Sequence, residues 1–236
     1  MWCWLGLLTG VAHGGSVTNN HYGQPLRWET DRIAFRLNPS GDHGLDPNAI
    51  EMALTDAVAQ WQSISPDWLE LAYEGRTDVD QASIDDGVHT IFFTDEWDET
   101  LDPDLLALTY VWSYEDGMIS HFDMAINTAH HTWGTDGADD SNDLCNAITH
   151  EFGHVLGLSH SGVNEATMYH ETEVGEVHKR DLDVDDMRTF LALYAADIDT
   201  GGSFIGAVGC AHTQSRHSAV WVIVTLLLTV FRRASS

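Results

Sequence analysis

The chain has 236 residues with 37 acidic and 10 basic side chains, which gives a formal net charge of −27. Because so acidic a surface repels nucleic acids and anionic lipids, nucleic acid is excluded as an expected partner. Hydrophobic residues, including nine Trp, make up 43% of the sequence, enough for one domain with a real core plus extra segments. The three cysteines are too few for a disulfide-built scaffold, and Cys145 is interpreted as a small buried apolar residue.

Residues 1–13 have the pattern of a signal peptide. The stretch is apolar from Trp2 to Ala12, with small residues near Ala12 where a signal peptidase could cut. It lacks the Lys or Arg that usually precedes the apolar run, so a buried N-terminal strand is the alternative. The first interpretation makes the protein secreted or exposed at the cell surface.

Hydrophobic periodicity predicts strands and a helix in the first part of the body. In "IAFRL", Ile33, Phe35 and Leu37 alternate on one face, as in a half-buried strand. "DPNAIEMALTDAVAQW" predicts a helix capped by Asp46 with Pro47 at its first position. The buried face of this helix is expected to consist of Ile50, Leu54, Ala57, Val58 and Trp61. Strands are also predicted at Trp68–Tyr73 and Val88–Thr94, and a hairpin at Leu106–Tyr114 and Met118–Ile126 around Glu115–Gly117.

Two helices are predicted in the second part of the body. A polar loop from Asn127 to Asp140 precedes a helix from Ser141 to Leu156, which stops at Gly157. "DVDDMRTFLALYA" predicts a last helix, capped by Asp183 or Asp181. Its inner face is expected to consist of Val184, Met187, Phe190, Leu191 and Tyr194. Together these elements predict an α+β domain.

The end of the chain differs in composition from the body. Residues 197–218 are rich in Gly and Ser and are interpreted as a linker. Residues 219–233 contain an apolar run followed by Arg232 and Arg233, and "GC" precedes them, as in the sorting signals of some bacterial surface proteins. The run is shorter than the roughly 20 residues of a membrane helix, although arginines beyond it are typical of a cytoplasmic flank. We expect a hydrophobic membrane anchor or sorting segment, with a packed terminal helix as the alternative.

The stretch "HEFGHVLGLSH" has the spacing of a catalytic zinc site. His150 and His154 are four residues apart on the predicted helix, so both imidazoles can reach one ion at about 2.0–2.1 Å. Glu151 is placed to face a water without ligating the metal. Gly157 permits a sharp reversal, after which His160 returns as a third ligand. Three neutral nitrogens leave a fourth position open, which is typical of a catalytic rather than a structural zinc.

The alternative is a helix that carries these residues for no chemical reason. With 14 His and 20 Gly in the chain, the five fixed positions coincide by accident with a probability of roughly 2 in 10,000. The pattern therefore indicates a metal site.

Several segments resemble one family of enzymes. "HEFGHVLGLSH" matches HExxHxxGxxH, the signature of the metzincin zinc peptidases, and "ATMYH" supplies Met168 for their methionine turn. Ser161 follows the third histidine, as in the matrixin branch. "LRWETDRIAFRLN" resembles the matrixin opening strand, "ISHFDMAIN" the edge strand beside the cleft, and "LDVDDMRTFLALYA" the closing helix. The resemblance to a bacterial matrixin-like metallopeptidase covers residues 24–196.

The resemblance implies a metzincin-like zincin catalytic domain with a twisted mixed β-sheet, an active-site helix and a C-terminal helix. It implies one catalytic zinc on His150, His154 and His160, with Glu151 as general base in peptide hydrolysis. Met168 is expected beneath the metal without a direct chemical role. The strand around Ser120–Ala125 is expected to pair with an extended substrate.

Two departures from the family pattern stand out. His170 follows Met168-Tyr169 where matrixins usually have Pro, so the wall of the specificity pocket is expected to differ. Because the stretch between the leader and Gln24 is short, we expect no inhibitory propeptide with a zinc-capping cysteine.

A second metal site is a further option, because matrixins also hold structural zinc and calcium. Its candidate ligands are His121, Asp123, Asp136 and Asp139. Asp136 and Asp139 belong to an acidic run that suits calcium, with Asp140 and Asp143. The alternatives are an ordinary strand histidine and a solvated loop that caps the next helix. His130 and His131 are interpreted as exposed loop histidines.

The sequence thus predicts a monomeric zinc endopeptidase that hydrolyses peptide bonds in extracellular or surface proteins. The alternative is a non-catalytic surface adhesion module that binds zinc or calcium. That alternative accounts for the tail and the charge but not for the His-Glu-His-Gly-His pattern.

Overall fold

The computed structural model describes residues 14–42, 44–194, 223–225 and 232–233. The predicted signal peptide, the predicted linker and most of residues 219–233 lie outside the described residues. None of the described helices is long and apolar enough to cross a membrane.

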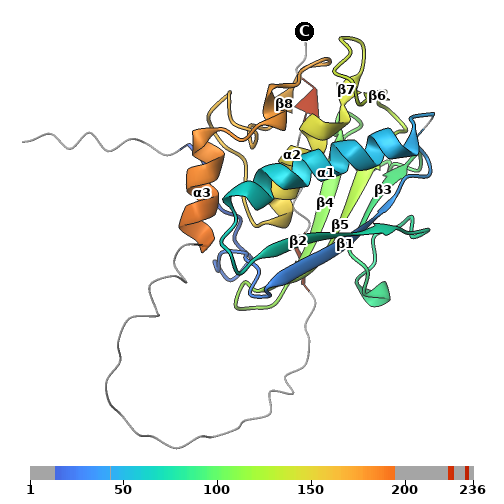
Figure 1. The fold of residues 1–236 in the computed structure, drawn as a ribbon. Coiled ribbons are helices and arrows are strands. Elements are labelled where there is room, and N and C mark those ends of the chain that lie inside the picture. Colours follow the sequence, from blue (N-terminus) through green and yellow to red (C-terminus); the bar gives the residue numbers. More distant parts are fainter. Residues whose placement is uncertain (1–13, 43, 195–222, 226–231, 234–236) are drawn as a thin grey trace, which may run out of the picture.

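A mixed sheet forms one layer, and helices pack on it (Figure 1). In spatial order its strands are β2 (Glu70–Arg76), β1 (Arg32–Asn38), β3 (Thr90–Thr94), β5 (Ile119–Asn127), β4 (Ala107–Ser113) and β9 (Ile223–Thr225). The pairs from β2 to β5 are parallel, while β4 is antiparallel to both β5 and β9. Two short parallel pairs lie outside this sheet: β6 (Trp133–Gly134) with β7 (Asn142–Asp143), and β8 (Glu171–Thr172) with β10 (Arg232–Arg233).

The helices are α1 (Pro47–Ile64), α2 (Leu144–Val155) and α3 (Val184–Tyr194), with short 3-10 turns at η1 (Ile84–Asp86) and η2 (His178–Arg180). α1 crosses the face of the sheet and packs on α2, while α3 stands at the side (Figure 1). These elements confirm the predicted α+β fold, with a mixed sheet, a site helix and a closing helix.

The prediction for α1 is confirmed in detail. The Asp46 side chain accepts a hydrogen bond from the backbone N–H of Asn48, and Pro47 opens the helix. Every residue predicted for its inner face is buried, and Trp61 donates its indole N–H to the carbonyl of Thr149 at 2.8 Å. α1 therefore fixes the position of α2 through a hydrogen bond as well as through apolar packing.

α2 is buried along its whole length, which is unusual for a helix that carries charged residue types. Its C-terminal carbonyls are satisfied by aromatic side chains from distant segments. Trp28 donates to the carbonyl of Val155 at 2.8 Å, and the Tyr194 hydroxyl donates to that of Leu156 at 3.0 Å. Residues near the start and near the end of the domain sequence thus both donate hydrogen bonds to the C-terminal end of α2.

Three predictions need correction. α2 begins at Leu144 rather than Ser141, because Asn142–Asp143 pair with β6 and Asp143 caps the helix by accepting from the N–H of Asn146. "ISHFDMAIN" is not an edge strand: β5 lies between β3 and β4, so Ser120–Ala125 has no free edge for a substrate. Among the strands of the body, β4 is the outermost on that side.

The third correction concerns the inner face of α3. Val184 and Leu191 are 52% and 44% exposed, whereas Phe190 and Tyr194 are buried as predicted. The buried face also contains Asp185, Asp186, Thr189 and Leu193. The two aspartates face inward because their carboxylates accept hydrogen bonds, Asp185 from the Ser161 hydroxyl and Asp186 from the N–H groups of Thr167 and Met168. Apolar periodicity alone does not reveal this.

Candidate metal centre

Three histidine side chains converge at the end of α2. His150 and His154 lie on the helix and His160 lies beyond its end, and one nitrogen from each falls within 4.8 Å of the others. The Nε2 atoms of His150 and His154 are 3.2 Å apart. In the part of the chain that the structure describes, this is the only such group of three or more metal-ligating side chains.

Backbone carbonyls fix the tautomers of the two helical histidines. His150 Nδ1 lies 2.6 Å from the carbonyl oxygen of Thr167, and His154 Nδ1 lies 2.9 Å from that of Leu158. A carbonyl only accepts, so Nδ1 carries the hydrogen in both rings and Nε2 carries a lone pair. The two lone pairs at 3.2 Å then face one another, which is unfavourable unless a cation lies between them.

The donor set fits a zinc ion. Tetrahedral bonds of about 2.0–2.1 Å place neighbouring ligand nitrogens about 3.3 Å apart, close to the spacing of the two helical Nε2 atoms. Nε2 of His160 is buried without a hydrogen-bond partner, which is costly for a polar atom that binds nothing. A metal ligand bond accounts for this atom.

Burial keeps all three imidazoles neutral, as metal ligation requires. It lowers the pKa of His154 to about 4, and, with the neighbouring His154 and His170, lowers that of His160 to about 3. The pKa of His150 is also well below its usual value, because the ring is wholly buried beside the other two.

Gly157 makes the reversal that returns His160 to the helix end. Its φ is +88°, and a Cβ at this position would lie 2.1 Å from the carbonyl oxygen of Leu26. The N–H groups of Gly157 and Leu158 donate to the carbonyls of His154 and Gly153, which closes the helix. The same turn aims the Leu158 carbonyl at His154, so one loop both ends the helix and orients a ligand.

Glu151 is fully buried next to the triad. Its Oε2 accepts a hydrogen bond from the Thr109 hydroxyl on β4 at 2.6 Å, while Oε1 has no hydrogen-bond partner. Burial raises the pKa of this carboxyl to about 7, and the bond from Thr109 partly opposes that rise. A carboxyl with a pKa near neutrality and one unpartnered oxygen is suited to accept and return a proton.

Met168 lies in a tight turn against α2, as predicted, and is 1% exposed. A Cβ on Gly153, one residue before His154, would lie only 2.2 Å from the Met168 sulfur, so a larger residue here would require the Met168 side chain to move. Asp186 holds the turn, because its carboxylate accepts the N–H groups of Thr167 at 2.7 Å and Met168 at 3.0 Å.

Sequence reasoning missed four residues that support the site although they lie outside the His150–His160 stretch, namely Thr109, Thr167, Asp185 and Asp186. Asp185 accepts a hydrogen bond from the Ser161 hydroxyl at 2.6 Å and from the N–H of Gly14 at 3.0 Å. The adjacent acidic residues at the start of the last helix were the available signal.

The candidates for a second metal site are not brought together as a group. His121 and Asp123 are neighbours on β5, and Nδ1 of His89 lies 3.0 Å from Nδ1 of His121. Asp123 accepts the N–H groups of Ser83 and Thr90, which satisfies it without a metal. Asp136 and Asp139 are exposed in the loop before α2.

The remaining predicted site features have ordinary structural roles. Asp143 caps α2 and pairs with Arg180. His130 is exposed as predicted, whereas His131 is half-buried with its Nε2 3.0 Å from the Pro103 carbonyl oxygen.

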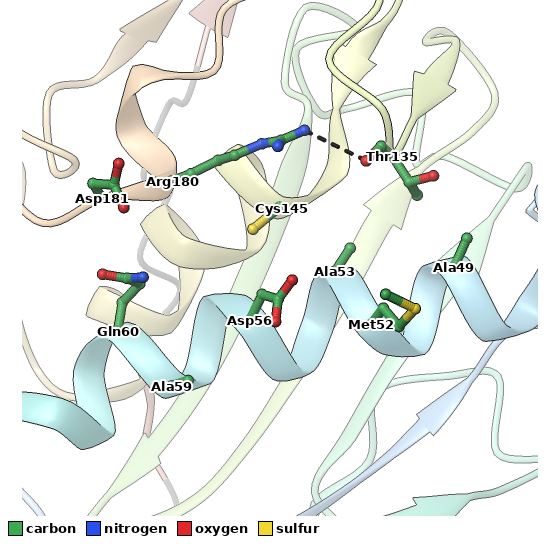
Figure 2. A pocket seen from close by; sticks show the side chains of 10 residues that line it. All are labelled: Ala49, Met52, Ala53, Asp56, Ala59, Gln60, Thr135, Cys145, Arg180 and Asp181. Atoms are coloured by element: carbon green, nitrogen blue, oxygen red, sulfur yellow. Dashed lines mark hydrogen bonds between the residues drawn. The ribbon is translucent and has the colours of Figure 1, made fainter.

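Cys145 is buried, as expected, at a pocket whose lining includes none of the three histidines (Figure 2). This pocket of about 510 Å³ lies between α1 and the start of α2. Burial raises the pKa of the thiol to about 11, so it remains protonated and is not a nucleophile near neutral pH. Figure 2 also shows Arg180 at the rim, bonded to the Thr135 carbonyl.

These features define a metzincin-type metallopeptidase domain. They are a helix that carries a His-Glu pair and a second histidine, a glycine turn after the helix, a third histidine beyond the turn, and a buried methionine turn. The chain belongs to the matrixin family, whose model matches residues 27–195. It therefore has the catalytic-domain fold that the sequence predicted.

Similar proteins occur in plants and animals. The chain is 29% identical over 191 residues to metalloendoproteinase 1-MMP of Arabidopsis thaliana, which covers 75% of this chain and 48% of that protein. It is 24% identical over 180 residues to matrix metalloproteinase-26 of Homo sapiens, covering 76% and 64%. It is 32% identical over 158 residues to metalloendoproteinase 4-MMP of Arabidopsis thaliana, covering 65% and 42%. The chain thus spans about half the length of the curated relatives it matches.

Proposed function

We propose that this chain is a zinc-dependent endopeptidase that hydrolyses peptide bonds in extracellular or surface proteins. The observation that carries the proposal is the convergence of three histidine nitrogens beside the buried Glu151 carboxylate. Membership of the matrixin family and the names of its relatives, metalloendoproteinases and matrix metalloproteinases, support it.

His150, His154 and His160 would hold the zinc ion through nitrogen. When bound there, zinc supplies Lewis acidity toward a water molecule and the scissile carbonyl group. Glu151 then takes a proton from the attacking water at its unpartnered Oε1 and passes it to the leaving amine. Thr109 holds the other carboxylate oxygen, so that this proton carrier keeps one orientation.

An extended substrate would be positioned by β-addition. Among the strands of the body, β4 rather than β5 is the outermost beside Glu151, so the backbone of a protein or peptide substrate would pair with the edge of β4 that β9 covers in this structure. This replaces the pairing with Ser120–Ala125 that the sequence predicted.

We further propose a secreted or cell-surface location, with residues 1–13 as signal peptide and residues 219–233 as an anchor or sorting segment. Their composition supports this, as do the relatives' names. One catalytic zinc per monomer is proposed. Calcium or a structural zinc is an additional option, but Asp136 and Asp139 do not form one site with His121 and Asp123.

The test uses the full chain and its Glu151→Ala variant, purified side by side. We expect one zinc per chain in both, and cleavage of an unstructured protein such as casein by the wild type only. Bound zinc without cleavage of any tested protein would favour the alternative, a non-catalytic zinc- or calcium-binding adhesion module. Absence of tightly bound zinc would refute the zinc endopeptidase and leave only the calcium-binding form of the alternative.

A further inference from the structure

Two short strands near the C-terminus pair with the body of the domain. β9 lies antiparallel on the outer edge of β4, with Val111 opposite Thr225, Trp112 opposite Val224 and Ser113 opposite Ile223. β10 lies parallel to β8, with Arg232 opposite Glu171 and Arg233 opposite Thr172. Figure 1 shows β10, in red, beside β8. Segments from the end of the chain therefore extend two separate strands of the domain.

β4 and β8 are both connected to the metal centre. β4 contacts it directly, because Thr109 donates its hydroxyl hydrogen to Glu151. β8 begins immediately after His170, whose ring centroid is 5.8 Å from that of the ligand His160. Tyr169 also forms a β-bridge with Ser161, the residue after that ligand. We call the outer edges of β4 and β8 the substrate path.

A strand edge can pair with only one additional strand at a time. Its unpaired N–H and C=O groups are what an extended peptide binds, and β9 uses those of β4. The residues that join β9 to β10 lie outside the described part of the chain, but their two ends are fixed on β4 and β8. A substrate and this segment therefore compete for the same backbone groups.

We propose that β9 and β10, the described parts of this segment, are built-in competitive occupants of the substrate path, which makes the peptidase autoinhibited until they leave. Autoinhibition rests on the proposed peptidase function, whereas the pairing of β9 and β10 with β4 and β8 does not depend on catalysis. The segment cannot lie on β4 and in a membrane at once, so autoinhibition applies to the chain before any anchoring or sorting.

Because the segment belongs to the same chain as the domain, weak strand pairing is sufficient to keep β4 occupied. A tethered segment has an effective concentration on the order of millimolar at its site, so three residues of strand pairing need not be tight. A segment that holds the path nine tenths of the time raises KM about tenfold without changing kcat. The segment thus acts on substrate binding and leaves the chemistry unaltered.

Occupancy is tested by amide hydrogen exchange in full-length Glu151→Ala, which cannot remove its own tail. Val224→Pro in this background removes an N–H and places a ring where the strand pairs. We expect faster exchange in the peptide covering residues 107–113, and none of this change in the matched Val224→Thr variant, which keeps the N–H and the β-branched shape. Equal exchange in all three proteins would overturn the proposal.

Inhibition is tested with the same substitutions in the active chain, using a short fluorogenic peptide at early times. We expect KM for Val224→Pro to fall about tenfold relative to wild type and Val224→Thr, with kcat unchanged. Faster exchange with unchanged KM would overturn autoinhibition, because the segment would then cover β4 without competing. If no protein cleaves the peptide but exchange responds as expected, occupancy stands and the proposed peptidase function fails.

Discussion

The hydroxyl group of Thr109 on β4 lies 2.6 Å from Oε2 of Glu151 on α2, and it is the hydrogen-bond donor that holds this buried carboxylate. Thr109→Val keeps the shape of the side chain but removes the donor. Since a hydrogen bond to a charged group contributes about 1.5–3 kcal/mol, we expect kcat to fall about tenfold or more with little change in KM.

Steady-state kinetics on a peptide substrate measure this effect, with Thr109→Ser as the matched control because it keeps the hydroxyl. Equal kcat for the Val and Ser variants would show that Thr109 does not position Glu151.

The proposed ligand His160 and its neighbour His170 provide a paired test of the metal centre. His160 Nε2 is buried without a partner, whereas the side chain of His170 is 42% exposed and stands outside the converging triad. We expect His160→Gln to weaken zinc binding by more than the roughly 10–100-fold that loss of an outer-shell partner costs. His170→Gln should keep one zinc per chain.

The readouts are zinc content after dialysis and the thermal midpoint with and without added zinc. Zinc should raise the midpoint of the wild type and His170→Gln, because a ligand that binds only the folded state stabilises it. An equal rise in His160→Gln would argue against His160 as a ligand.

The catalytic constellation could be predicted because it is local in sequence. His150, Glu151 and His154 lie within two turns of one helix, and Gly157 determines how His160 returns, so residue spacing alone specifies the geometry. Thr109 and Asp186 could not be predicted in the same way. Their contacts with Glu151 and the Met168 turn depend on how β4 and α3 pack on α2, and nothing in their own segments encodes that.

The strand order shows the same limit. The alternation in "ISHFDMAIN" predicts a strand, but whether a strand is central or at the edge depends on its partners. β5 pairs with β3 along one edge and with β4 along the other, and all of its side chains except the half-buried Ser120 are buried. The inner face of α3 was predicted wrongly for a related reason. Apolar periodicity assigns aspartates to the outer face, but an aspartate that accepts hydrogen bonds from buried partners lies on the inner face.

Gly157 is expected to be among the least replaceable residues. Its φ of +88° disfavours any L side chain, and a Cβ there would lie 2.1 Å from the Leu26 carbonyl oxygen. Gly87 has a φ of +68° with nothing within 4 Å of a built Cβ, so Gly87→Ala carries the conformational cost alone. We expect about 1 kcal/mol of destabilisation for Gly87→Ala and several kcal/mol for Gly157→Ala.

Urea unfolding of zinc-free proteins gives the two free energies of unfolding. Similar values for the two variants would mean that the backbone near Leu26 moves away at little cost, and that the close approach is not what requires glycine.

Burial of His89 makes the stability of the fold depend on pH. The ring stacks on Phe122 and faces His121, and burial, with the neighbouring His121, lowers its pKa to about 4, while Asp86 and the Phe122 backbone partly oppose this. The carboxylate of Asp123 on β5 also belongs to this cluster, because it contacts His121. Because the unfolded chain binds a proton at a pKa near 6.5, the stability is fully present above pH 6.5 and is lost as the pH falls toward 4.

His89→Phe keeps a ring of similar shape and removes the titration. We expect the wild type to lose at most about 3 kcal/mol more than His89→Phe between pH 7 and pH 4, as measured by urea unfolding at each pH. His130→Phe, at an exposed loop position, is the control and should follow the wild type. Parallel losses in wild type and His89→Phe would mean that His89 is not the group whose protonation opposes folding, and that the acid sensitivity lies in other residues.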